Sequence, residues 1–254
     1  MSDAASRIPN ALDESFGRGR PALICYLPLG DPALQHADPA EYLAEGVDVL
    51  EVGVPAADSK LDGPVIAESM RRARENGMDN AIAAGAIAEL RGRFDAAAMV
   101  WMTYPSAAAE PGWADAVAAS GVDGTLVAGA GPGQYRPPGG VRQVVFVPHT
   151  PTSRDLTAAA EATGYVMAAA ANGVTGNRLG ISPGNGALLE RIRASGVTVP
   201  LVLGFGISDR ASAHHAVECG AQGVVVGSAV VSAAAQGRDV LARLLRELRA
   251  GLDG

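Results

Sequence analysis

Eight short runs of apolar, largely β-branched residues recur along the chain, separated by segments long enough to hold a helix. The runs begin at Ala22, Val47, Ala97, Gly124, Val144, Gly164, Val199 and Gly223. Amphipathic segments lie between them, for example residues 64–77, 80–94, 186–196 and 209–220. Continuously apolar strands that alternate with helices are typical of parallel β/α units buried on both faces. Eight such units in 254 residues predict an α/β protein, a single-domain (β/α)8 TIM barrel over residues 1–254.

The unit after the fourth strand departs from this pattern. Residues 129–143 contain Pro132, Pro137, Pro138 and several glycines, which disfavour a regular helix. We therefore expect a loop or a short turn there. An open, doubly wound sheet could also be built from eight parallel strands, but no GxGxxG motif follows the first strand.

Composition excludes several functional classes. A net charge of −7 argues against a nucleic-acid-binding surface, which needs a basic face. Cys25 and Cys219 lie far apart without a CxxC motif, so we expect no zinc site, and the support for a disulfide is weak. Residues 1–17 lack the apolar core of a signal peptide, and no apolar run is long enough to span a bilayer. These features favour a cytoplasmic protein that does not bind membranes.

Two carboxylates stand out in the stretch from Val49 to Pro64. Glu51 lies within the apolar second strand, and Asp62 follows in a loop punctuated by glycine and proline. Burial of an ionised carboxylate costs several kcal/mol unless it is compensated. In a barrel, the ends of the strands and the loops that follow them carry the active site. The alternatives are that Glu51 pairs with an arginine and that Asp62 caps the next helix.

Glycine turns at three other strand ends predict an anion site. Gly206 follows the seventh strand, while Gly227 and Ser228 follow the eighth. Thr175 and Gly176 lie in the loop after the sixth strand. Backbone amides at such turns and at a helix N-terminus bind phosphate without a cationic side chain, although Ser228 could be only a helix cap.

Several motifs together resemble the tryptophan synthase alpha subunit family. They are "YLPLGDP" (26–32), "LEVGVPAADSKLDGP" (50–64), "NGVTGNR" (172–178), "GFGIS" (204–208) and "GSAVV" (227–231). They follow the family order and cover nearly the whole chain. The resemblance implies cleavage of indole-3-glycerol phosphate to indole and glyceraldehyde 3-phosphate, without a cofactor or a metal.

The resemblance also implies roles for individual residues. Glu51 matches the glutamate that protonates the indole ring carbon, and Asp62 matches the aspartate that binds the indole N–H. An apolar pocket should raise the pKa of the acid, whereas a polar loop position should keep Asp62 ionised. The remaining predicted substrate- and phosphate-binding residues are Tyr26, Thr175, Gly176, Phe205, Gly206, Gly227 and Ser228.

Four positions depart from the family pattern. Met167 stands where the family has a tyrosine near the catalytic glutamate, so we expect that hydroxyl to be lost, and Tyr26 is the residue that could supply another. Residues 59–61 differ from the usual catalytic loop, the asparagine–proline element after the third strand is missing, and Gly129 replaces an aspartate. The last three changes suggest a weakened or altered interface with a beta subunit. The alternatives to a stand-alone lyase are a catalytically weak subunit that binds a phosphate ligand and regulates a beta-like pyridoxal-phosphate partner, or a lyase for another phosphorylated substrate.

Overall fold

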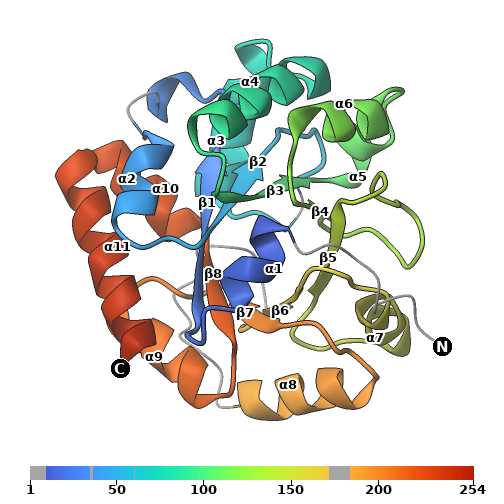
Figure 1. The fold of residues 1–254 in the computed structure, drawn as a ribbon, viewed down its shortest axis with the longest axis vertical. Helices are drawn as coiled ribbons and strands as arrows, with labels where there is room; N and C mark the ends of the chain where they lie inside the picture. Colours follow the sequence, from blue (N-terminus) through green and yellow to red (C-terminus); the bar gives the residue numbers. More distant parts are fainter. Residues whose placement is uncertain (1–9, 35–36, 60, 172–183) are drawn as a thin grey trace.

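A computed structural model describes residues 10–34, 37–59, 61–171 and 184–254. Its strands form a closed, parallel barrel in which each strand pairs with its neighbours in sequence and β8 pairs with β1 (Figure 1). The predicted (β/α)8 barrel is thereby confirmed. The strands are β1 (Ala22–Pro28), β2 (Val49–Gly53), β3 (Ala98–Thr103), β4 (Gly124–Val127), β5 (Arg142–Val147), β6 (Val166–Ala169), β7 (Leu201–Gly204) and β8 (Gly223–Val226).

Helices surround the barrel and bury their apolar sides against the strands. They are α1 (Ala11–Phe16), α2 (Pro39–Ala44), α3 (Pro64–Glu75), α4 (Asn80–Arg93), α5 (Pro105–Ala108), α6 (Trp113–Ser120), α7 (Ser153–Ala160), α8 (Asn185–Ala194), α9 (Arg210–Glu218), α10 (Ser228–Gln236) and α11 (Arg238–Asp253), with a 3₁₀ turn η2 (Pro32–Leu34). Most strands are buried on both faces, as their continuous apolar runs predict.

The segment between β4 and β5 contains no helix, as expected from its prolines and glycines. Residues 128–141, all of them described, connect the two strands as loop and turns. Tyr135 anchors this loop: its hydroxyl donates to the carbonyl of Pro105 at 3.0 Å, and its ring meets Trp113 edge-on. The loop thus uses side-chain contacts where the other units use a helix.

The short helix α1 closes the amino-terminal end of the barrel, and Figure 1 shows it lying across the ring of strands. Its Leu12 is 1% exposed and approaches Gly124 and Gly164, where an added Cβ would lie 3.1 Å and 3.2 Å from the leucine Cδ2. The Asn10 amide also donates to the carbonyl of Asp123 at 2.9 Å. This end is filled, which leaves the carboxyl ends of the strands for a site.

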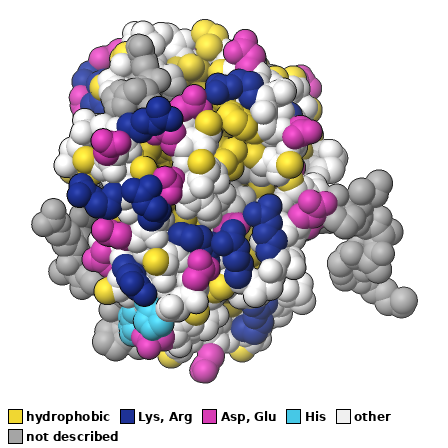
Figure 2. Space-filling model, turned by 60° about the vertical axis from the view of Figure 1, so that its left-hand side comes forward, with side chains coloured by type: hydrophobic (Ala, Val, Ile, Leu, Met, Phe, Trp, Pro, Cys, Tyr) yellow, Lys and Arg dark blue, Asp and Glu magenta, His cyan; other side chains and the backbone are white. Residues whose placement is uncertain are grey.

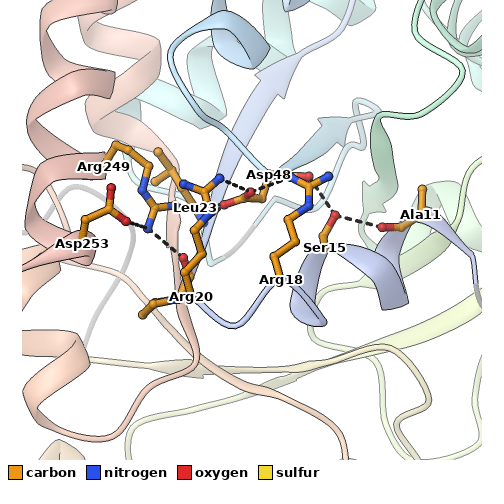
Figure 3. A network of polar contacts seen from close by, with 9 residues as sticks. Ala11, Ser15, Arg18, Arg20, Leu23, Asp48, Arg249 and Asp253 are labelled. Carbon is orange, nitrogen blue, oxygen red and sulfur yellow. Dashed lines mark hydrogen bonds and ion pairs between the residues drawn. The ribbon is translucent and has the colours of Figure 1, made fainter.

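A buried carboxylate joins distant segments at the same end (Figure 3). Asp48 precedes β2 and accepts hydrogen bonds from the guanidinium groups of Arg18, Arg20 and Arg249 at 2.8–3.0 Å, and from the amide of Leu23. Its side chain has no exposed surface. Because it has several charge-assisted donors, its burial is compensated, and it ties β1 and the chain before it to α11.

Figure 2 shows basic and acidic side chains intermixed on the face turned toward the viewer. Among the pairs that account for such mixing, Arg238 of α11 binds Glu41 at 2.6 Å, and Arg246 binds Glu45 at 2.7 Å. Basic side chains that are paired with acids do not form the uniformly basic surface that nucleic acid needs. Among the described residues, no helix combines the length and apolar character needed to cross a membrane.

Candidate active site

Glu51 lies in the middle of β2, with its side chain buried inside the barrel. It is 3% exposed and stands beside Tyr26 of β1 and Val100 of β3 in the strand register. Burial raises the pKa of this carboxyl from 4.5 to about 7; a hydrogen bond from Tyr165 acts in the opposite direction, and the charge of Asp62 adds to the rise. Glu51 is therefore an acid that titrates near neutral pH, and its hydrogen-bond partner is a tyrosine rather than the arginine that the alternative required.

The expected loss of a tyrosine hydroxyl near Glu51 is wrong. Met167 does lie in the site cavity, but Tyr165, two residues earlier, donates from its hydroxyl to Glu51 Oε1 at 2.5 Å. Tyr165 lies just before β6 and Met167 lies within it. Both side chains reach the interior because residues two apart along an extended chain face the same way. Tyr26 was the suggested substitute, but Tyr165 is the donor. The feature of the sequence that could have indicated this donor is a tyrosine at the start of the sixth apolar run.

Asp62 lies in the loop between β2 and α3. The cap residue of α3 is Gly63, without a side-chain cap, so the interpretation of Asp62 as a helix cap is wrong. Its Oδ2 is buried and has no hydrogen-bond partner among the described residues. Burial raises the pKa of the Asp62 carboxyl from 3.8 to about 7, and a hydrogen bond from Tyr104 partly opposes this rise. The expected polar environment with an unshifted carboxylate is therefore also wrong.

The two carboxyl groups line one cavity. Its lining residues come from strands, from the segments that follow them and from α3: Tyr26, Glu51, Leu61, Asp62, Ile66, Met102, Tyr104, Ala128, Phe146, Met167, Phe205, Val225 and Gly227. Phe146 and Phe205, both in this lining, have ring centroids 5.3 Å apart. A largely apolar cavity with two acids suits an aromatic ligand whose reaction moves a proton.

The glycine turns lie beside this cavity. Gly206, with φ of +84°, follows β7, while Gly227 precedes α10 and also lines the cavity. An added Cβ at Gly227 would lie 2.9 Å from Ile66 Cδ1, so this position has room only for glycine unless Ile66 moves. Phe205 has a φ of +68°, which is strained for a residue with a Cβ and which presents its ring to the cavity.

Ser228 is the first residue of α10 and not its cap, so the interpretation of this serine as a cap is wrong. It lines, together with Gly206, an open groove that adjoins the cavity along α10. Backbone amides at the start of a helix are groups that can bind an anion, and α10 begins at this groove. Thr175 and Gly176 lie outside the described residues. Among the described residues, no cluster of three His, Cys, Asp or Glu side chains is arranged to hold a metal ion.

Comparison with known proteins identifies the family of this chain. The family model for the tryptophan synthase alpha chain matches residues 12–251. The chain belongs to that family. The predicted membership is confirmed, and it supports an alpha-subunit-like lyase.

Relatives with the name tryptophan synthase alpha chain are similar over nearly the full length. One from Xylella fastidiosa (strain M12) is 36% identical over 90% of this chain and 91% of its own length. One from Leifsonia xyli subsp. xyli is 34% identical, covering 97% of this chain and 98% of its own. A solved structure of Mycobacterium tuberculosis tryptophan synthase superimposes with a TM-score of 0.81 at 30% identity, over 99% of this chain and 98% of that one.

Proposed function

We propose that this alpha-subunit-like protein is a carbon–carbon lyase that cleaves indole-3-glycerol phosphate to indole and glyceraldehyde 3-phosphate. One observation supports this most directly: Glu51 and Asp62, both with a pKa of about 7, lie in one largely apolar cavity that reaches Gly227 at the start of α10. The aromatic part of the substrate would lie among the apolar side chains, and its phosphate at Gly206, Gly227 and Ser228.

In the proposed reaction, Glu51 gives one proton to the substrate and later takes another proton from it. Protonated Glu51 donates to the indole ring carbon that carries the glycerol chain, and the ring nitrogen becomes positively charged. Ionised Asp62 accepts a hydrogen bond from that N–H and stabilises the charge. Glu51, now a carboxylate, takes the proton of the adjacent glycerol hydroxyl. A carbonyl forms there, the carbon–carbon bond breaks, and its electron pair returns to the ring.

The raised pKa values fit this division of roles. A general acid works best when its pKa is near the working pH. The Asp62 charge raises the pKa of Glu51, so ionised Asp62 favours protonated Glu51 next to it. At neutral pH, a substantial fraction of the protein then carries one proton on the pair, as the first step requires.

Indole release from indole-3-glycerol phosphate by the purified chain tests the proposal. We expect Glu51→Gln to lower kcat by about 10²–10⁴-fold, because it removes the group that transfers the proton. Glu89→Gln is the matched control, since Glu89 is exposed on α4. Wild-type release no higher than that of Glu51→Gln would refute the proposed lyase.

We further propose that the chain works without a partner in the cytosol, on the basis of the altered loops after β2, β3 and β4. The second candidate is a weakly active subunit that regulates a beta-type pyridoxal-phosphate enzyme, and the likeness to Mycobacterium tuberculosis tryptophan synthase favours it. Adding a beta subunit to the assay separates the two. A stand-alone lyase keeps its rate within about twofold, whereas a regulatory subunit raises the partner's activity without releasing indole by itself.

A third candidate is a lyase for a different phosphorylated substrate. The small side chains of Ala168–Ala171 and the Met167 position in the cavity are the features that favour it. Assays of other phosphorylated aryl substrates beside indole-3-glycerol phosphate test this candidate. A higher kcat/KM for one of them would identify it as the substrate.

A further inference from the structure

The loop that carries Asp62 (residues 54–62, with residue 60 outside the described residues) is held at several points by the last residue of β3 and the segment that follows it. The hydroxyl of Thr103 donates to the carbonyl of Val54 at 3.0 Å, at the start of the loop. Tyr104 faces Asp62 at its end and hydrogen-bonds its carboxylate. Between these two contacts, Ser106 binds the middle of the loop.

Ser106 binds the loop through both its backbone and its side chain. Its N–H approaches both carboxylate oxygens of Asp58, at 3.2 Å and 3.3 Å, and its hydroxyl donates to Asp58 Oδ1. The same hydroxyl accepts from the N–H of Ala57 at 3.2 Å. One serine therefore satisfies a carboxylate and a backbone amide four to five residues before Asp62.

The segment that contains Ser106 is itself fixed from behind. Asn80, the first residue of α4, is buried, and its Nδ2 donates to the carbonyl of Ala107 and to Glu110 Oε2, both at 2.9 Å. Ser106 is thus held between a buried amide on one side and the loop on the other. A hydrogen bond restrains a loop only as firmly as its donor is held, and here the donor is anchored.

We propose that Ser106 is a positioning residue that fixes the loop through Asp58, so that Asp62 faces the cavity. The proposal rests on the proposed lyase function, in which Asp62 stabilises charge in the transition state. Ser106 touches neither the substrate nor the reacting atoms. Its effect reaches Asp62 through the neighbouring Ser59, because the amide of Asp62 donates to the carbonyl of Ser59 at 3.2 Å.

The substitution Ser106→Ala removes the hydroxyl and both of its hydrogen bonds but leaves the backbone N–H. We expect the amides of Ala57 and Asp62 to exchange their hydrogens about tenfold faster, because the loop opens more often. We expect kcat to fall by about tenfold with KM within twofold, since displacement of a group that acts in the transition state lowers kcat.

Two variants serve as controls. Ser106→Thr keeps the hydroxyl and should restore both the exchange rates and kcat to within threefold of wild type. Ser195→Ala removes a hydroxyl that donates to the carbonyl of Ile192 at 2.7 Å, just after α8, and should change neither readout. The decisive experiment is the double variant that combines Ser106→Ala with Asp62→Asn. Without the Asp62 charge, Ser106→Ala should have no further effect on kcat.

Unchanged exchange of the loop amides in Ser106→Ala would overturn the proposal, as would an equal loss of kcat with and without Asp62→Asn. If Ser106→Ala does not fold, Asp58→Ala, which removes the other side of the same contact, provides the same test with the same expected outcomes. If the wild type releases no indole, the lyase proposal fails, and the exchange measurements still decide whether Ser106 holds the loop.

Discussion

Tyr165, the residue just before β6, donates a 2.5 Å hydrogen bond to Glu51 in the middle of β2, across the interior of the barrel. The tyrosine ring also packs against Phe16 of α1, with their centroids 5.6 Å apart. The acid is therefore positioned by a residue that is itself held by the helix closing the other end of the barrel. Glu51 and Asp62 have raised pKa values for the same main reason, burial, but they have different tyrosine donors.

Replacement of Tyr165 by phenylalanine should raise the pKa of Glu51 above about 7. The hydroxyl stabilises the carboxylate form, so its loss favours the protonated acid. A hydrogen bond to a charged group contributes roughly 1.5–3 kcal/mol, which corresponds to a shift of about 1–2 pH units. The pH dependence of kcat/KM measures this shift. A profile that stays in place would mean that the Tyr165 contact does not tune Glu51.

The substitution Asp62→Asn should move the same pKa downward. The charge of Asp62 raises the pKa of Glu51, and asparagine removes that charge at nearly constant size. We expect kcat to fall by about 10²–10³-fold, as with the loss of other groups that stabilise transition-state charge. The residual activity should show a pH profile displaced to lower pH, opposite in direction to that of Tyr165→Phe. A displacement in the same direction would contradict the arrangement.

The stability of the fold should fall as the pH rises from about 5 to about 8. The folded-state pKa of Glu51, about 7, is above its ordinary value of 4.5, so the folded protein holds a proton that the unfolded chain has released. This contribution is fully present below the unfolded pKa, is lost as the pH rises through about 7, and is on the order of 3 kcal/mol.

Urea unfolding of Glu51→Gln measures this contribution. The variant should lose the part of the pH dependence that Glu51 contributes, while the part from Asp62, whose pKa is also raised, remains. It should also gain free energy of unfolding relative to wild type at about pH 8. Glu89→Gln provides the control for an exposed glutamate. Equal effects of Glu51→Gln at about pH 5 and about pH 8 would show that Glu51 does not titrate in this range.

A negative charge at the start of α10 should weaken the binding of a phosphorylated substrate. We expect Ser228→Asp to raise KM for indole-3-glycerol phosphate by at least about tenfold, because two like charges would share one set of amides. Ser153→Asp places the same charge at the first position of α7 and serves as the matched control. An unchanged KM in Ser228→Asp would exclude this helix start as the phosphate site.

The Asp48 cluster should matter for stability rather than for chemistry. Asp48→Asn leaves Arg249, only 10% exposed, without its buried counter-ion, and it weakens the contacts of Arg18 and Arg20. Loss of one partner of a buried ion pair typically costs about 3–5 kcal/mol of unfolding free energy. Thermal unfolding should show the loss, while kcat of the folded fraction stays within twofold. A melting temperature like that of wild type would mean that the arginines find other partners.

The sequence alone determined the architecture, because parallel strands buried on both faces read as apolar runs whose order and spacing need no knowledge of distant contacts. The sequence also indicated Glu51 and Asp62 as candidate catalytic residues. The signals were the rarity of a carboxylate in an apolar strand and the family motifs around both residues. The missing helix between β4 and β5 followed from local proline and glycine chemistry.

Only the tertiary structure decided what surrounds these residues. Tyr165 is far from Glu51 in sequence, and closure of the barrel brings their side chains together inside it. Asp62 was expected in a polar loop, yet packing of that loop over the cavity buries it and raises its pKa. Ser106 and Asp58 are also far apart in the sequence, and the fold brings them into contact. Electrostatic environment depends on every neighbour in space, whereas strand and helix patterns depend on neighbours along the chain, so only the latter can be read from sequence.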